Sequence, residues 1–145
     1  MLVEAIQNAL ANETTVNVLL GSPSSRPDST NGVFPSQAPD APTMPYIVVN
    51  QVSGEPLGGS MMAGTGALTT ESWKVSCHGS TYRAAKILSK AVRLFLLSWN
   101  GAQTAAAVTV SGAYCTLEAD ETEALGRGTL FSTDLDFELI YTDTL

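Results

Sequence analysis

The stretch TYRAAKILSKAVRLFLLSW, residues 81–99, decides the fold class of this chain. Its apolar residues recur every three or four positions and form one wide stripe, which is the pattern of an amphipathic helix. The stripe consists of Ala84, Ala85, Leu88, Ala91, Val92, Phe95, Leu96 and Trp99. Ser80 or Thr81 is placed to cap the start of this helix, and Asn100 and Gly101 end it. A stripe this wide requires a hydrophobic surface to cover.

Strand patterns on both sides of the helix supply that surface. Residues 68–78 alternate, with Trp73, Val75 and Cys77 on one side, and residues 46–52 (YIVVNQV) are rich in β-branched side chains. The segment from Thr129 to Tyr141 alternates as well. Its predicted core side holds Phe131, Leu135, Phe137, Leu139 and Tyr141, and its predicted outer side holds Ser132, Asp134, Asp136 and Glu138.

Two further patterns complete the predicted elements. Residues 2–11 have the apolar spacing of a helix, whereas residues 16–20 are a short apolar run that fits either a strand or a continuation of that helix. Two apolar runs, residues 105–110 and 113–119, bracket the dipeptide Ser111–Gly112. A two-residue connection of this kind predicts a hairpin.

Three segments are predicted to be loops. Residues 21–45 hold six of the seven prolines, residues 53–67 hold five glycines, and residues 120–128 are acidic and end in glycine. We expect the glycine-rich segment to be an arm between two strands. The whole pattern predicts the α+β class, with one domain spanning residues 1–145, an antiparallel or mixed β-sheet, and about two α-helices packed on one face.

Composition restricts the partners of the chain. Its 145 residues include 14 acidic and 7 basic ones, for a formal net charge of -7. General binding to free nucleic acid needs a basic surface that displaces counterions, so this charge argues against such binding and favours protein partners. The start of the chain lacks a basic signal-peptide region, and no apolar run is long enough to span a bilayer. We expect a soluble cytoplasmic protein with no membrane association.

The sequence offers no set of residues that would make an enzyme. His78 is the only histidine, and Cys77 beside it points to the opposite face of a strand. Cys77 and Cys115 fit buried thiols better than a redox or zinc site. The glycines of residues 53–67 lack the phosphate-binding pattern, and an extended acidic strand cannot wrap a calcium ion. We therefore expect no catalytic residues, no metal and no cofactor.

One charge pattern does indicate a function. The predicted helix of residues 81–99 places its basic residues at intervals of three and four, on a face expected to lie opposite the apolar stripe. This basic ridge consists of Arg83, Lys86, Lys90 and Arg93. The acidic strand face of Asp134, Asp136 and Glu138 complements it, and such complementary patches suit head-to-tail association into a ring. A solvated helix face and a solvated strand face are the plainer alternatives.

A family resemblance gives these surfaces a meaning. The stretches MPYIVV at residues 44–49 and VSGEP at residues 52–56 resemble the opening of the tail terminator, or tail completion, family of long-tailed double-stranded DNA phages and prophages. The stretch WKVSCHGSTYRAA at residues 73–85 is similar to the family's strand that runs into a helix. The tripeptide at residues 92–94 resembles that helix's end, and DLDFELIY at residues 134–141 resembles the family's last strand.

The resemblance implies a structural virion protein and no enzyme. Such a subunit forms a ring, generally a hexamer, on the last ring of the major tail tube protein, stops growth of the tube and offers the surface that joins the head-completion or connector protein of the filled head. It would be located in the virion tail, and in the host cytoplasm during assembly. The alanine-rich segment 104–110 and the acidic segment 120–128 depart from the family pattern.

Residues of the predicted loops take roles in this hypothesis. We expect three apolar residues of the glycine-rich arm, Leu57, Met61 and Met62, to contact the tube or a neighbouring subunit. The acidic loop with Asp120, Glu121 and Glu123 is the first candidate for the channel lining, through which DNA passes only transiently. The acidic strand is assigned to subunit contact before channel lining. The alternatives are a head-completion or connector ring, and a small enzyme or ligand-binding domain.

Overall fold

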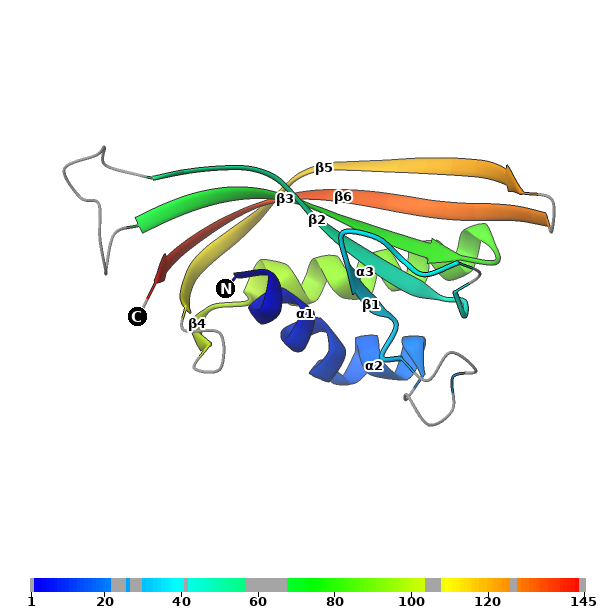
Figure 1. Cartoon of the computed structure of the whole chain (residues 1–145), viewed down its shortest axis with the longest axis horizontal. Coiled ribbons are helices and arrows are strands. Elements are labelled where there is room, and N and C mark those ends of the chain that lie inside the picture. The colour runs from blue at the N-terminus through cyan, green and yellow to red at the C-terminus, as the bar shows by residue number, and fades with distance from the viewer. Residues whose placement is uncertain are drawn as a thin grey trace.

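A computed structural model describes residues 2–21, 26, 30–40, 42–56, 68–103, 108–125 and 128–143 of the chain (Figure 1). The described helices are α1 (Leu2–Asn12), α2 (Thr14–Leu20) and α3 (Tyr82–Ser98). The described strands are β1 (Val33–Pro35), β2 (Tyr46–Pro56), β3 (Leu68–Gly79), β4 (Gly101–Gln103), β5 (Val108–Leu125) and β6 (Gly128–Asp143).

The strands form one sheet, and the helices lie on one face of it (Figure 1). The order across the sheet is β1-β2-β3-β6-β5-β4. Strand β1 runs parallel to β2, and the other neighbouring strands are antiparallel, so the sheet is mixed. The predicted α+β class is confirmed. The other face of the sheet carries no helix in the described part of the chain, and we call it the open face.

The core lies between the sheet and the helices. Directly opposite residues of antiparallel strands share a face, and Trp73 lies opposite Phe137 while Val75 lies opposite Leu135. All four side chains are buried, as are Leu88, Val92 and Leu96 of α3, and they belong to one cluster. The inward-facing apolar side chains of β3 and β6 therefore pack against the apolar stripe of α3, as predicted.

The run of residues 16–20 proves to be part of a second helix, α2. The carboxylate of Glu13 accepts a hydrogen bond from the backbone N–H of Val16 at 2.8 Å and caps its first turn. Val16 and Leu20 lie one turn apart, and both are buried. Periodicity over so short a run could not distinguish helix from strand, whereas the cap at Glu13 does.

The predicted hairpin at Ser111–Gly112 is wrong. Strand β5 passes through both residues, and its pairing with β6 shifts register between Val110 and Gly112 and again between Cys115 and Leu117. Glycine inside a strand often marks a bulge, and Gly112 lies directly beyond the first of these shifts. The predicted acidic loop of residues 120–128 is wrong for the same reason, because β5 continues to Leu125.

Both other predicted loops contain strand. Within residues 21–45, β1 pairs with residues 47–49 of β2, and Gln7 of α1 donates a hydrogen bond to the carbonyl of Val33 at 3.0 Å. Within the predicted arm of residues 53–67, the first four residues belong to β2, whose register with β3 continues to Pro56. The rest of that arm lies outside the described residues.

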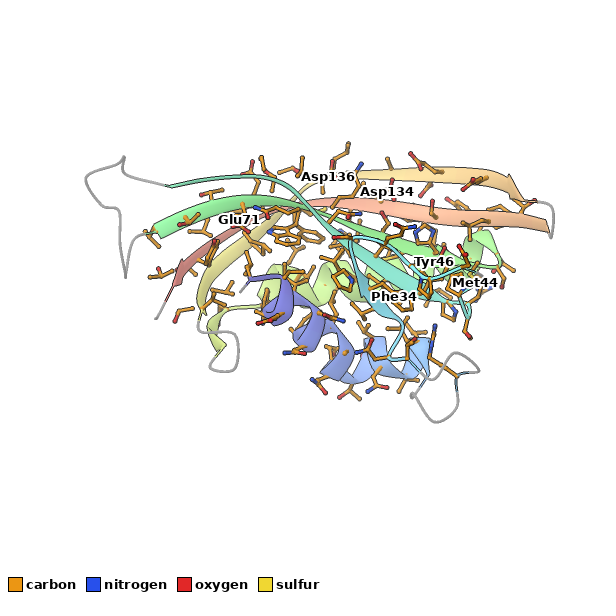
Figure 2. All side chains as sticks on the ribbon, in the orientation of Figure 1. Phe34, Met44, Tyr46, Glu71, Asp134 and Asp136 are labelled. Carbon is orange, nitrogen blue, oxygen red and sulfur yellow. The ribbon has the colours of Figure 1, made fainter. Side chains whose placement is uncertain are left out.

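The segment after β1 covers one corner of the open face. Phe34, Tyr46 and Val48 form a second, smaller buried cluster, against which Ala38 and Met44 pack. The rings of Phe34 and Tyr46 meet edge to face, with their centroids 6.1 Å apart (Figure 2). Part of the proline-rich segment is thus an integral piece of the fold.

Candidate functional site

The basic ridge of α3 is divided between two environments. The Lys86 ammonium lies 2.8 Å from Oδ1 of Asp120 and 3.3 Å from Oε1 of Glu118, both on β5 of the same chain. Arg93 is half-buried, and its Nε is buried without a hydrogen-bond partner in the described structure. Arg83 and Lys90 are exposed. The ridge therefore does not lie wholly opposite the apolar stripe, because Lys86 reaches sideways to the sheet.

The cluster around Lys86 ties the start of α3 to β5. Asp120 also accepts hydrogen bonds from the hydroxyl groups of Tyr82 at 3.2 Å and of Thr133 at 3.0 Å. The hydrogen bond with Lys86 is the main cause that lowers the pKa of Asp120, and the same bond raises the pKa of Lys86. The Lys86 and Asp120 side chains are 32% and 38% exposed, so water screens the interaction and its contribution to stability is small.

The acidic strand residues lie on the open face. Asp134, Asp136 and Glu138 alternate with Leu135 and Phe137, whose side chains are buried under the helices. Figure 2 shows Asp134 and Asp136 on the side of the sheet away from the helices. The ridge and the acidic strand of one subunit therefore occupy opposite sides of the sheet.

The three predicted channel residues do not share a face. Asp120 lies opposite the buried Thr133 and points to the helix side, where it binds Lys86. Glu121 and Glu123 alternate with it along β5 and lie on the open face with the acidic strand. The open face thus gathers carboxylates from β5 and β6, and the residues predicted from a loop belong to a rigid strand.

Among the described strand residues, one cation, Lys74, accompanies these carboxylates on the open face. Lys74 of β3 lies directly opposite Asp136 of β6 and opposite Asn50 of β2. Oδ1 of Asp136 is nevertheless buried without a hydrogen-bond partner in the described structure. Ser76 and Ser72 lie opposite Asp134 and Glu138. The open face is therefore acidic along β6, with polar residues beside it.

His78 and Cys77 are neighbours on β3, and their side chains lie on opposite faces of the sheet. The ring of His78 stacks on Tyr46 with centroids 4.5 Å apart, and its Nδ1 is buried without a hydrogen-bond partner in the described structure. Burial lowers the pKa of His78, although the charges of Asp134 and Glu123 oppose this effect. Cys77 is fully buried on the other face, and its burial raises the pKa of the thiol, so the two side chains do not pair.

The two cysteines differ in burial. Cys77 is buried as predicted, whereas Cys115 is only half-buried on β5, where its thiol donates to the carbonyl of Leu117. Across the described ranges, no three His, Cys, Asp or Glu side chains gather as a metal site would require. None of the helices described is long and apolar enough to cross a membrane.

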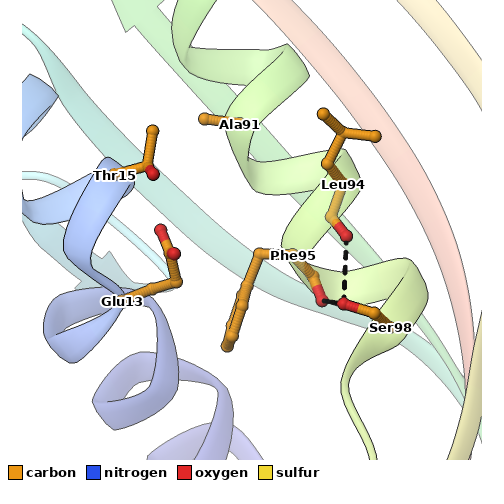
Figure 3. A pocket seen from close by; sticks show the side chains of 6 residues that line it. All are labelled: Glu13, Thr15, Ala91, Leu94, Phe95 and Ser98. Atoms are coloured by element: carbon orange, nitrogen blue, oxygen red, sulfur yellow. Dashed lines mark hydrogen bonds between the residues drawn. The ribbon is translucent and has the colours of Figure 1, made fainter.

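A shallow pocket of about 270 Å³ lies between α2 and α3 (Figure 3). Two of its polar side chains, Glu13 and Ser98, already have partners within the chain. The Glu13 carboxylate caps α2, and the Ser98 hydroxyl donates to the carbonyls of Leu94 and Phe95. Its other lining residues are Thr15 and Ala91. The pocket resembles a gap between two packed helices, without the convergent polar groups of a ligand site.

Sequence reasoning missed two polar residues that organise the fold. Glu71 accepts hydrogen bonds from the indole N–H of Trp73 at 2.9 Å and from the hydroxyl of Tyr141 at 2.6 Å. Arg26 is 5% exposed and donates to backbone carbonyls. For Arg26, the only signal in the sequence is that it is an isolated arginine in a proline-rich segment. Leu57, Met61 and Met62 lie outside the described residues.

The fold has a counterpart among solved structures. A chain from the "Virion of native gene transfer agent (GTA) particle" is similar to this one with a TM-score of 0.62. The sequences are 15% identical, and the match covers 96% of this chain and 92% of the other. The two chains share one fold over nearly their full lengths. No family model matches this chain, and no curated protein matches it.

Proposed function

We propose that this protein is a structural virion protein that forms a ring, a hexamer, on the end of a phage-type tail tube. There it ends growth of the tube and provides the surface for head joining. The observation that supports the proposal most is the near full-length likeness of the fold to a chain of a gene transfer agent virion. The tail terminator stretches of the sequence, such as MPYIVV at residues 44–49, point the same way.

The partners follow from this role. The ring would bind copies of itself, the major tail tube protein on one side and a head-completion or connector protein on the other. Its place would be the virion tail, after assembly in the host cytoplasm.

The open face suits the wall of the channel. It carries Asp134, Asp136 and Glu138 from β6, joined by Glu121 and Glu123 from β5. A negative wall leaves DNA mobile, because it offers no cations to replace the counterions of the phosphates. We therefore place the acidic strand at the channel in preference to the subunit contact. Arg83 and Lys90 stay available for contacts with a neighbour on the helix side.

The test is docking to purified tail tubes. The full chain is mixed with tubes assembled from the tube protein of the same genome, and electron microscopy counts the tube ends that carry a ring. We expect rings at one end of each tube and an arrest of tube elongation. Rings that bind only DNA-filled heads would support the connector role, and a protein that binds neither would contradict the proposal.

A further inference from the structure

The sheet has a long open edge at β5. On the side of β5 away from β6, strand β4 pairs only with residues 108–110, and the described part of the chain places no strand beside residues 111–125. The register with β6 is regular from Leu117 to Leu125, so the outer side of this segment presents a straight row of backbone N–H and C=O groups. An edge of this kind is a template for another strand.

A second open edge lies at the opposite end of the same sheet. Strand β1 pairs with residues 47–49 of β2, and the N–H of Ser36 extends that cover by donating to the carbonyl of Val49. On the side away from β3, no described strand pairs with Asn50–Pro56. Each edge carries an exposed apolar side chain, since Val52 is 63% exposed and Leu117 is 55% exposed.

The strand directions make the two edges compatible. Strands β2, β3, β6 and β5 are neighbours in that order, and each pair is antiparallel, so β2 and β5 run in opposite directions. A copy placed beside the first by rotation about an axis along the strands keeps its direction. Its β2 would therefore meet the β5 of the first copy as an antiparallel neighbour, which is the more stable pairing.

The charges of the two edges favour pairing of β5 with the β2 of another copy over pairing of two β5 strands. A junction between two β5 edges would oppose Glu118, Asp120, Glu121 and Glu123 with the same residues of the other copy, and directly opposed like charges are destabilising. The β2 edge is uncharged from Asn50 to Gly54. Lys74 lies directly opposite Asn50 on β3 and places a cation one strand behind that edge.

We infer that the ring closes by antiparallel pairing of the β5 edge, residues 117–125, of one copy with the β2 edge, Asn50–Pro56, of the next. The sheets then form one continuous wall around the channel, with the open faces inside and the helices outside. The contact is heterologous, so it propagates from copy to copy until the ring closes. The inference rests on the proposed ring and specifies how its subunits meet.

Disulfide trapping tests the junction. One protein carries Ser53→Cys and the others carry Glu121→Cys, Thr122→Cys or Glu123→Cys, all in the Cys115→Ser background, while Cys77 stays because it is fully buried. We expect oxidised mixtures to form dimers that contain one β2 variant and one β5 variant, in rings formed on tubes. Dimers of a β5 variant with itself would overturn the inference in favour of a symmetric contact.

Proline at consecutive edge positions provides an independent measurement. The backbone N–H groups of Glu121 and Thr122 point to opposite sides of β5, so one faces β6 and the other faces the open edge. Glu121→Pro and Thr122→Pro are therefore compared by their melting temperatures. The variant that keeps the melting temperature of the wild type has lost only the N–H that faces the open edge. We expect that variant to lose its rings in sedimentation.

The outcomes separate the two proposals. If the folded proline variant forms rings as the wild type does, or if rings form without cross-links between β2 and β5 variants, the edge junction is wrong while the tail role stands. If the wild type forms no ring even with tubes present, the proposed function itself is wrong.

Discussion

At the scale of single residues, Arg26 is the side chain on which the proline-rich segment most depends. Its guanidinium donates to the carbonyls of Leu20 at 2.8 Å, Pro45 at 2.6 Å and Thr43 at 2.6 Å. Leu20 is far in the sequence from Thr43 and Pro45, so one planar donor group connects the end of α2 to the residues that precede β2. The hydrogen bonds are charge-assisted, which makes them stronger than neutral ones.

We predict that Arg26→Ala lowers the free energy of unfolding by about 3 kcal/mol, because it leaves several carbonyls without their donor in a buried place. The free energy of unfolding of Arg26→Lys should lie between those of the wild type and Arg26→Ala, since an ammonium keeps the charge but lacks the planar arrangement of donors. Urea titration measures both. The exposed Arg83→Ala serves as the control, and an Arg26→Ala protein as stable as that control would contradict the account.

A second prediction concerns the pH dependence of the Lys86 cluster. The pKa of Asp120 is lowered in the folded state, chiefly by its hydrogen bond with Lys86. The stabilisation is therefore present above the ordinary carboxyl pKa of about 4 and is lost as pH falls through the lowered value. We expect Lys86→Met to reduce stability by at most about 1 kcal/mol at neutral pH, because the pair is exposed.

The stability difference between wild type and Lys86→Met should shrink as the pH is lowered below about 4. Urea titrations at a series of pH values measure this. Lys90→Met is a matched control on the same helix, because Lys90 is exposed and should give a difference that does not change with pH in this range. If the stability difference between wild type and Lys86→Met instead grew on acidification, the hydrogen bond with Lys86 would not be the cause of the lowered pKa of Asp120.

At the scale of elements, the junction between β3 and α3 has the sharpest sequence requirements. The Thr81 hydroxyl accepts a hydrogen bond from the N–H of Ala84 at 3.1 Å, so Thr81 and not Ser80 is the cap. A Cβ on Gly79 would lie 2.8 Å from the backbone nitrogen of Ala85, so the close approach of strand and helix requires glycine there.

We predict that Thr81→Ala lowers the free energy of unfolding by about 1 kcal/mol, the usual contribution of a helix cap. Ser80→Ala should change it by less than about 0.5 kcal/mol, because Ser80 is exposed and lies outside the cap. Thermal and urea unfolding of the two variants compare neighbouring residues of similar chemistry. Equal losses would show that the hydrogen bond to Ala84 does not stabilise the helix.

The elements that sequence predicted well are those whose period is unbroken. The alternation around Trp73 and Phe137 and the stripe of α3 each persist over several turns or pleats, so their buried faces could be predicted. The course of strand β5 could not be predicted, because two register shifts interrupt the alternation of its side chains. Without a continuous alternation across Ser111–Gly112, this dipeptide resembles a turn in the sequence. The roles of Arg26 and Glu71 could not be predicted, because each has a hydrogen-bond partner distant in the sequence: Thr43 for Arg26 and Tyr141 for Glu71.

The sequence identifies the charged residues of the candidate site, but it does not indicate how they are arranged in space. The basic and acidic patches exist, yet only the pairing of strands shows that Asp120 faces α3 while Glu121 faces the open side. The side-chain direction of a strand residue depends on its register, and a bulge reverses it for every residue that follows. The sequence therefore could not indicate that Lys86 pairs with Asp120 within its own chain.

At the scale of the whole molecule, the exposed part of the ridge can be tested apart from the sheet edges. We predict that Arg83→Glu with Lys90→Glu weakens ring assembly on tubes by less than about thirtyfold at low salt, since two exposed ion pairs contribute at most about 1 kcal/mol each. The effect should vanish at high salt through screening. Complete loss of rings in a folded double variant, at high salt as well, would show that the ridge and not the sheet edge is the main interface.

The open face leads to the last prediction, which concerns DNA. The wild-type ring should not bind duplex DNA stably at low salt, because its proposed wall is acidic. Asp134→Lys with Glu138→Lys should create binding that weakens steeply as salt is raised, since the new cations would release counterions from the phosphates. These two positions lie opposite Ser76 and Ser72, so the substitutions keep added charge away from Lys74, which lies opposite Asp136.

A neutral variant, Asp134→Asn with Glu138→Gln, separates the loss of negative charge from the gain of positive charge. We expect it to bind DNA hardly better than the wild type, because neutral side chains release no counterions. Fluorescence anisotropy of labelled duplex DNA across a salt series measures all three rings. Tight, salt-sensitive binding by the wild-type ring would exclude an acidic channel and would favour a connector that holds DNA, since only a cationic surface gives that salt dependence.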